Sequence, residues 1–250
     1  MITLAELDSH YDFAVTEMLW GFDELQKLVP PPQRQKYVDG FTYRYQERTV
    51  HQALILKLAR LISTLRGAKL LLDAGHVMEV GGLQRWLDET SEDIALLCGP
   101  LTVGKEERIH SDYLDQFWRE EFDIPGDAIN SRQKRGMVPR DKIQAYVART
   151  FSGGNPSAMQ AVSRSVYKAY SGFVHGAAVH ILDIFGGRPP SFHLAGVSGT
   201  RRHDISVADF LNYVYRSLMS AAMIASAFKT YEVNVRLTES YRELAKRAGV

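Results

Sequence analysis

Apolar residues recur at helical intervals along most of the chain, and they predict a series of long amphipathic helices. Thr3 and Glu6 have the spacing of a capping box, so the first helix is expected to begin there. It is expected to end before prolines 30–32, because proline lacks the backbone donor and clashes with the preceding turn. A second stripe predicts a helix over about residues 44–74, with Gly75 as its C-terminal stop.

A third helix is expected to follow at once and to end at Gly99 and Pro100. The short connection favours an antiparallel helical hairpin. A short acidic amphipathic helix comes next, and then the pattern fails over about residues 123–140. This segment is predicted to be an exposed basic loop that leads into a brief helix around Tyr146.

Asn155 and Pro156 predict the start of another helix, with Asn155 as N-cap and Pro156 as the first helical residue. This helix is the most apolar in the chain and is expected to reach about residue 185 as a core helix. A Gly, Pro and Ser-rich loop over about residues 186–205 follows, with a small hairpin. Ser206 with Asp209 resembles a capping signal for one long final helix, bent near Asn234.

These elements predict an all-α fold: a single-domain helical bundle with long antiparallel helices and two irregular loops. The composition, 45% hydrophobic and 24% charged, excludes disordered and fibrous proteins. The net charge of +1 provides no global attraction to nucleic acid, so polyanion binding would need a local patch. Cys98 is the only cysteine, which excludes an intrachain disulfide framework. We expect a cytoplasmic protein, because no signal peptide or membrane-spanning stretch is recognisable.

One side of the apolar helix carries polar residues. At about 100° per residue, Arg164, Lys168, Ser171 and His175 fall on one face, flanked by Tyr170. Polar groups on a core helix need partners. The predicted partners, on the third helix, are Arg85 and Glu89.

Two interpretations of this face remain open. In the first, His175, Ser171 and Glu89 form an internal hydrogen-bonded network that fixes the bundle's register. In the second, His175 is a general acid or base beside cations that hold a phosphate.

The segment from Tyr167 to Gly176 resembles the signature of an uncharacterised bacterial family of HEPN-like helical domains, with a tyrosine, a serine and then an apolar residue followed by His175. Upstream, Arg85, Trp86, Leu87 and Glu89 resemble that family's helix with an arginine, an apolar pair and a glutamate.

The resemblance implies a helical bundle, often homodimeric, from a superfamily rich in toxins of toxin–antitoxin systems and in phage-defence proteins. Its active members cleave RNA without metal or other cofactor, using an arginine, four to six further residues and a histidine. Here Lys168 holds the arginine position before His175, and Arg164 lies farther along the same face. Lysine is a point charge and cannot grip a phosphate bidentately.

Other constellations point to different chemistry. Glu107 with His110 has the spacing of a di-metal carboxylate motif, and His203 with Asp204 resembles the dyad of metal-dependent phosphohydrolases. Neither is accompanied by the further ligands that such sites need, so no metal site is predicted. The basic loop could hold phosphates or could be a solvated loop. Its candidate nucleic-acid contacts are Arg132, Lys134, Arg135, Arg140 and Lys142.

The sequence therefore leaves three functions open. The first is a homodimeric HEPN-like protein of bacterial defence or stress that binds or cleaves RNA. The second is a non-catalytic regulatory protein that acts through a protein partner. The third is a metal-dependent phosphohydrolase. None of the three involves a membrane.

Overall fold

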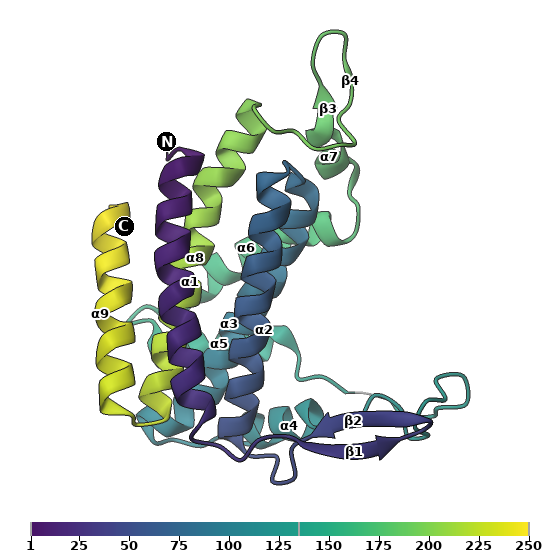
Figure 1. Ribbon diagram of the computed structural model, residues 1–250, viewed down its shortest axis with the longest axis vertical. Coiled ribbons are helices and arrows are strands. Elements are labelled where there is room, and N and C mark those ends of the chain that lie inside the picture. Colours follow the sequence, from purple (N-terminus) through teal and green to yellow (C-terminus); the bar gives the residue numbers. More distant parts are fainter. Residues whose placement is uncertain (1, 135, 250) are drawn as a thin grey trace.

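The computed structural model describes residues 2–134 and 136–249, and it confirms the predicted all-α fold. The long helices lie side by side along the long axis of the molecule, and two small antiparallel hairpins project from its ends (Figure 1). In chain order the elements are α1 (Leu4–Gln26), β1 (Gln33–Tyr37), β2 (Gly40–Arg44), α2 (Val50–Asp73), α3 (Val77–Val103), α4 (Arg108–Phe117), α5 (Arg140–Phe151), α6 (Pro156–Val174), α7 (Ala178–Ile181), η1 (Leu182–Ile184), β3 (Phe185–Gly186), β4 (Ser191–Phe192), α8 (Arg201–Ala227) and α9 (Tyr231–Ala248).

The N-terminal boundary of α1 is the predicted one. The Thr3 hydroxyl accepts from the backbone of Glu6, and the Glu6 carboxylate accepts from the backbone N–H of Thr3. The predicted start of α2 near residue 44 is wrong, because residues 33–44 form the β1–β2 hairpin. A second capping box, made by Thr49 and Gln52, begins α2 after this hairpin.

Helices α2 and α3 form the predicted antiparallel hairpin, joined through Gly75 in the left-handed conformation. The predicted end of α3 at Gly99 and Pro100 is wrong, since the helix continues to Val103 and ends at Gly104. Pro100 removes the backbone donor to the Leu96 carbonyl, but it stands only three residues before Val103, the last residue of the helix, where the Thr102 hydroxyl also donates to the Cys98 carbonyl at 2.9 Å. The proline is therefore accommodated near the end of the helix.

Residues 118–139, as far as they are described, contain neither helix nor strand, as the loss of periodicity predicts. This segment lies against the β1–β2 hairpin at one end of the molecule (Figure 1). The Gly126 N–H donates to the Tyr37 hydroxyl at 3.1 Å, and Arg44 pairs with Glu120 at 2.7 Å. The loop is thus attached to the hairpin at two points.

Helix α6 begins at the predicted Asn155 cap but ends at Val174, eleven residues before the predicted end near residue 185. Gly176, with φ of 63°, turns the chain into α7, η1 and the β3–β4 hairpin. No residue of α6 is buried, so its interpretation as a core helix is wrong. The helix packs against α3 and α5 at the edge of the bundle and leaves its other side in solvent.

The core lies instead among α1, α2, α3 and α8, around fully buried side chains such as Leu58 and Phe210. The predicted single final helix is wrong. The chain reverses after α8 at Lys229, which has φ of +56°, and α9 returns along α8 and α1. Helix α8 begins at Thr200, whose hydroxyl accepts from the N–H of His203, and not at the predicted Ser206 and Asp209. No helix in the described ranges is long and apolar enough to cross a membrane.

Candidate functional site

The predicted polar face of α6 is a solvent-facing row. Arg164, Lys168 and His175 are exposed, and Ser171 is half-buried. His175 is the C-cap residue of the helix, and its N–H donates to the Ser171 carbonyl. None of the three exposed side chains forms an ion pair with a carboxylate of the described chain. The predicted internal network of His175, Ser171 and Glu89 is therefore wrong.

Tyr170 points the other way, toward α8. Its hydroxyl donates to Oδ2 of Asp209 at 2.5 Å, and the Gln84 amide donates to the same oxygen at 3.2 Å. Burial raises the pKa of the Tyr170 phenol above its usual value, and the hydrogen bond to Asp209 raises it further. The structure thus separates Tyr170 from His175, with which the sequence had grouped it.

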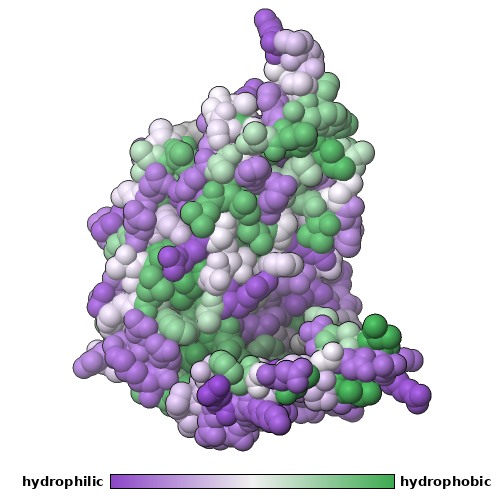
Figure 2. Space-filling model, turned by 45° about the vertical axis from the view of Figure 1, so that its right-hand side comes forward, coloured by the Kyte–Doolittle hydropathy of each residue, from purple (hydrophilic) through white to green (hydrophobic). Residues whose placement is uncertain are grey.

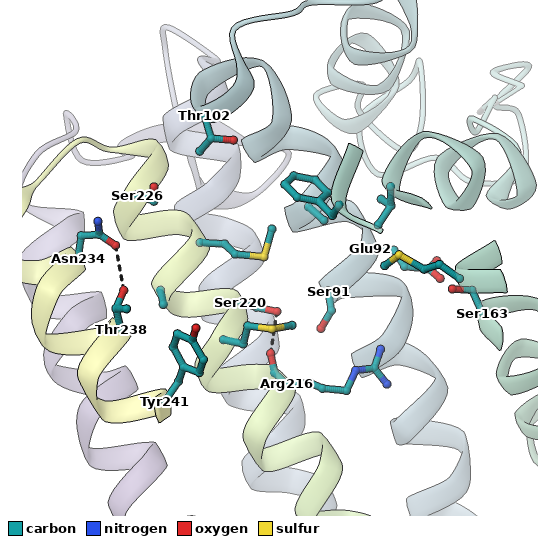
Figure 3. A pocket seen from close by; sticks show the side chains of 17 residues that line it. Ser91, Glu92, Thr102, Ser163, Arg216, Ser220, Ser226, Asn234, Thr238 and Tyr241 are labelled. Carbon is teal, nitrogen blue, oxygen red and sulfur yellow. Dashed lines mark hydrogen bonds between the residues drawn. The ribbon is translucent and has the colours of Figure 1, made fainter. Parts of the chain in front are cut away.

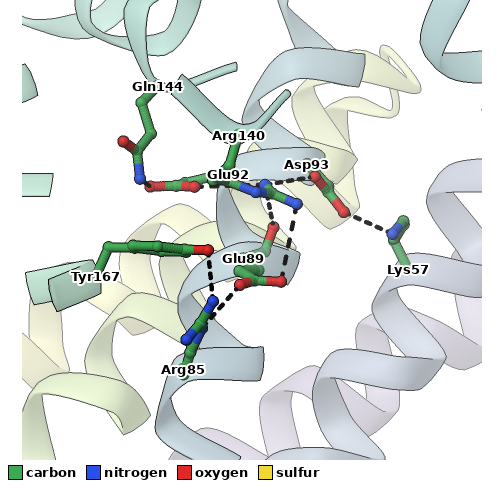
Figure 4. Close-up of polar contacts among 8 residues, drawn as sticks. All are labelled: Lys57, Arg85, Glu89, Glu92, Asp93, Arg140, Gln144 and Tyr167. Carbon is green, nitrogen blue, oxygen red and sulfur yellow. Dashed lines mark hydrogen bonds and ion pairs between the residues drawn. The ribbon is translucent and has the colours of Figure 1, made fainter. Parts of the chain in front are cut away.

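The predicted partners on α3 belong to a larger network between α2, α3, α5 and α6 (Figure 4). The Arg85 guanidinium pairs with Glu89 at 3.1 Å, donates to the Tyr167 hydroxyl and lies 4.1 Å from the centre of the Tyr167 ring. Arg85 therefore does reach α6 as predicted, but through Tyr167. Glu89 also faces Arg140 of α5, at 4.0 Å.

Arg140 lies at the centre of this network and is mostly buried. Its guanidinium contacts Asp93 at 2.8 Å and Glu92 at 3.4 Å, and Lys57 from α2 pairs with Asp93 at 2.7 Å. The prediction that Arg140 belongs to an exposed nucleic-acid-binding loop is thus wrong, because Arg140 begins α5 and pairs with carboxylates of α3. Arg135 lies outside the described residues, and the other three predicted loop cations are exposed: Arg132, Lys134 and Lys142.

A second polar cluster joins α3 to α8. Arg216 pairs with Asp88 at 2.5 Å, and the Tyr213 hydroxyl donates to the same carboxylate at 3.2 Å. Burial raises the pKa of Asp88 above its ordinary value, although Arg216 opposes this shift. The two clusters together tie α3 to α2, α5, α6 and α8.

A cavity of about 700 Å³ lies beside these clusters, a size typical of small-molecule sites (Figure 3). Helices α3 and α8 form its floor, α9 one wall, and α5 with α6 the opposite wall. We call it the α3/α8 groove. The groove could not be predicted from the sequence, because five helices that are far apart in the chain contribute to it. Its principal apolar side chains are Ala95, Val147, Phe151, Met159, Met219, Met223 and Tyr241.

Glu92 is the carboxylate of the α3/α8 groove. Its Oε1 accepts from the Gln144 amide at 3.1 Å, and its Oε2 lies 3.4 Å from Arg140. Burial raises its pKa to about 7, against the opposing effect of Arg140. A carboxyl that titrates near neutral pH beside a cavity is a feature of functional sites.

The histidines of the two alternative metal motifs, His110 and His203, form hydrogen bonds inside the protein. His110 is buried and its Nδ1 accepts from the Glu107 N–H at 2.8 Å, while His203 is buried with its Nε2 2.7 Å from the Leu72 carbonyl. Across the described ranges, no group of three or more His, Cys, Asp and Glu side chains is arranged to hold a metal ion. Cys98 is fully buried.

Large hydrophobic side chains are exposed around α7 and the β3–β4 hairpin. Figure 2 shows them gathered near the upper end of the molecule, below the hairpin tip. The surface begins directly beside His175. Its members include Val174, Val179, Ile181, Leu182, Phe185, Phe192 and Leu194.

The comparisons with known proteins return no relatives: no family model, no curated protein and no solved structure matches this chain.

Proposed function

We propose that this protein binds RNA through the phosphate backbone, using the exposed face of α6. The observation that carries the proposal is the row of Arg164, Lys168 and His175, which are exposed and free of carboxylate partners in the described chain. Basic side chains that are already paired would have to give up a protein contact to bind a phosphate. These three need not do so.

The charge distribution supports the same conclusion. Residues 142–203 contain seven Lys or Arg and one acidic residue, Asp183, which gives this segment a net charge of +6 in a chain of net +1. Arg149 and Arg202 pair with Glu107 and Asp183. The remaining cations are exposed. A local field of this kind attracts polyanions although the whole protein is nearly neutral.

The dimensions of the row suit a nucleic-acid strand. Arg164 and His175 are eleven residues apart, so they lie about 16 Å apart along the helix axis. A strand of nucleic acid presents several phosphates over such a length. The row can therefore contact more than one phosphate, without reading base sequence.

The geometry favours binding over cleavage. Metal-independent cleavage needs a general acid and a general base that both reach the reacting ribose. Arg85 is held by Glu89 and Tyr167, and Tyr170 is held by Asp209. Within one chain, therefore, neither Arg85 nor Tyr170 is available to act together with His175. We therefore propose binding as the function of this face.

The exposed apolar surface beside His175 supports a homodimer as part of the proposal. Leu182 is 56% exposed and Leu194 79% exposed, and contiguous apolar surface of this kind marks interaction sites. A dimer formed there would place two α6 rows on one assembly. Light scattering of the wild type beside Leu182→Asp tests this: a dimer that the substitution dissociates supports it, and a wild-type monomer contradicts it.

The test of RNA binding is fluorescence anisotropy of a labelled single-stranded RNA over a range of salt concentrations. Replacing Arg164 and Lys168 with Gln should weaken binding and reduce the slope of log K against log salt by about 1.4, since each lost phosphate contact to a single strand contributes about 0.7. The matched control replaces Arg242 and Lys246, two exposed cations of α9, which changes the net charge equally. Equal weakening in both double variants would contradict a specific role for α6.

The same preparations test cleavage. Wild type and His175→Ala are incubated with the RNA in EDTA, and the products are separated by gel electrophoresis. We expect intact RNA in both. Cleavage that disappears in His175→Ala would replace the binding proposal with a ribonuclease.

A further inference from the structure

The α3/α8 groove is a second candidate site, on a different part of the molecule from the exposed face of α6. Its cavity of about 700 Å³ is partly open, and most of the surface that lines it is apolar. Three of the lining side chains are methionines, which adapt their shape to the molecule they contact (Figure 3). The groove is therefore suited to an apolar body of small-molecule size.

Two charged side chains line the groove, Glu92 and Arg216. Arg216 is already matched, because it pairs with Asp88 at 2.5 Å. The charge on Glu92 is matched less well, since Arg140, its cationic partner among the described residues, lies 2.8 Å from Asp93 and 3.4 Å from Glu92. The uncompensated charge at the groove is thus negative and is located on Glu92.

A positively charged ligand complements the ionised form of Glu92. An anionic headgroup would meet the Glu92 carboxylate and would find Arg216 already neutralised. A cation near Glu92 completes the pairing of its carboxylate. The hydroxyls of Ser91 and Ser163 also line the groove, and they are neutral groups that can donate a hydrogen bond to a polar group on the ligand. The Phe151 ring lines the groove as well, and an aromatic ring can attract a cation placed over its face.

We propose that the α3/α8 groove binds an organic monocation with an apolar body, whose charged group pairs with Glu92 and whose body lies against Phe151, Met219 and Met223. This site does not depend on the RNA-binding proposal. No residue of the α6 row contributes to it.

The test uses three probes with the same ten-carbon chain: decyltrimethylammonium, decanol and decanoate. Binding to the full-length protein is measured by titration calorimetry below the critical micelle concentrations. We expect decyltrimethylammonium to bind at least tenfold more tightly than decanoate. Decanoate binding as tightly as the cation, or no binding of the cation, would overturn the proposal.

Two substitutions locate the site. Glu92→Gln keeps the size of the side chain and should weaken the cation at least tenfold while leaving decanol unchanged. Met223→Trp fills the groove and should abolish binding of both. Glu121→Gln, at an exposed carboxylate that does not line the groove, is the control for general charge effects. Equal loss in Glu92→Gln and Glu121→Gln would overturn the assignment.

The affinity should also depend on pH, because the quaternary ammonium keeps its charge and Glu92 does not. The groups that face Glu92 are Arg140 and Gln144 of α5 and Asp88 and Asp93 of α3, and Arg216 of α8 neutralises Asp88. Affinity is expected to rise between pH 5.5 and pH 8, and this rise should be absent in Glu92→Gln. A rise of equal size in the variant would show that another group controls binding and would overturn the role of Glu92.

Discussion

Arg140, the first residue of α5, places its guanidinium 2.8 Å from the carboxylate of Asp93 in α3. Both side chains are largely buried, and Glu92 and Lys57 extend the contact on either side. The chain enters α5 from the irregular segment 118–139, so this ion pair fixes where the helix starts relative to α3. Its contribution to stability can be measured directly.

Replacing Arg140 with Met should lower the free energy of unfolding by about 3–5 kcal/mol, because it removes the cation beside buried Glu92 and leaves Asp93 with Lys57 alone. Arg149→Met is the matched control in the same helix. Arg149 pairs with Glu107 at the surface, where such a pair contributes about 0–1 kcal/mol. Urea unfolding of both variants checks the difference, and equal losses would contradict the central role of Arg140.

Stability should depend on pH through Glu92. Its pKa is raised to about 7 in the folded protein from an ordinary value of 4.5, so the folded state favours the protonated form. The stabilisation is complete below pH 4.5 and is lost as the pH rises through 7. The change amounts to roughly 3 kcal/mol. In urea unfolding, the free energy of unfolding of Glu92→Gln should rise relative to that of the wild type by most of this amount between pH 5 and pH 8. Parallel pH profiles would contradict the shift.

Two adjacent glycines of α3 should respond oppositely to alanine. A Cβ at Gly81 would lie 2.6 Å from the Phe173 ring of α6, whereas a Cβ at Gly82 would meet nothing within 4 Å. Gly81→Ala should therefore cost about 1–3 kcal/mol, and Gly82→Ala should stabilise the helix by about 0.5–1 kcal/mol. Thermal unfolding checks both signs. If Gly81→Ala stabilised the protein, Phe173 of α6 would be able to move away from the new methyl group without a cost in stability.

The hydrogen bond from Tyr170 to Asp209 should contribute to the attachment of α6. Tyr170→Phe removes the donor and leaves a partly buried carboxylate with Gln84 as its remaining partner, at a cost of about 1–3 kcal/mol. Tyr231→Phe, at a side chain that is 81% exposed, is the control and should be neutral. Chemical unfolding followed by circular dichroism distinguishes the two.

Much of the helical fold could be predicted from the sequence where local chemistry determines it. The cap residues Thr3 and Asn155 act through their own side chains on backbone groups three residues away, and both were found. The β1–β2 hairpin was missed because its first strand, Gln33–Tyr37, is exposed and lacks the alternating apolar residues that reveal a half-buried strand. The break at Lys229 was missed because no glycine or proline marks it.

The position of α6 could not be predicted from periodicity alone. Its apolar residues suggest a core helix, yet Val162 is 63% exposed and Val174 is 45% exposed. Burial depends on which neighbours cover a face, and α6 is covered mainly by α3 and α5 on one side. The same reason hides the α3/α8 groove, since Glu92 and Arg216 become neighbours of one cavity only after α3 and α8 pack.

The single thiol of Cys98 provides an internal probe of unfolding. Cys98 lies in α3 and its side chain is fully buried, so a reagent cannot reach the sulfur in the folded state. Burial also raises the pKa of the thiol, which disfavours the reactive thiolate. Modification by a thiol reagent must wait for the surrounding helices to open. The rate of modification then reports the population of opened molecules, and no cysteine has to be engineered for the measurement. All the variants described above keep Cys98, so their stabilities can be ranked by this rate.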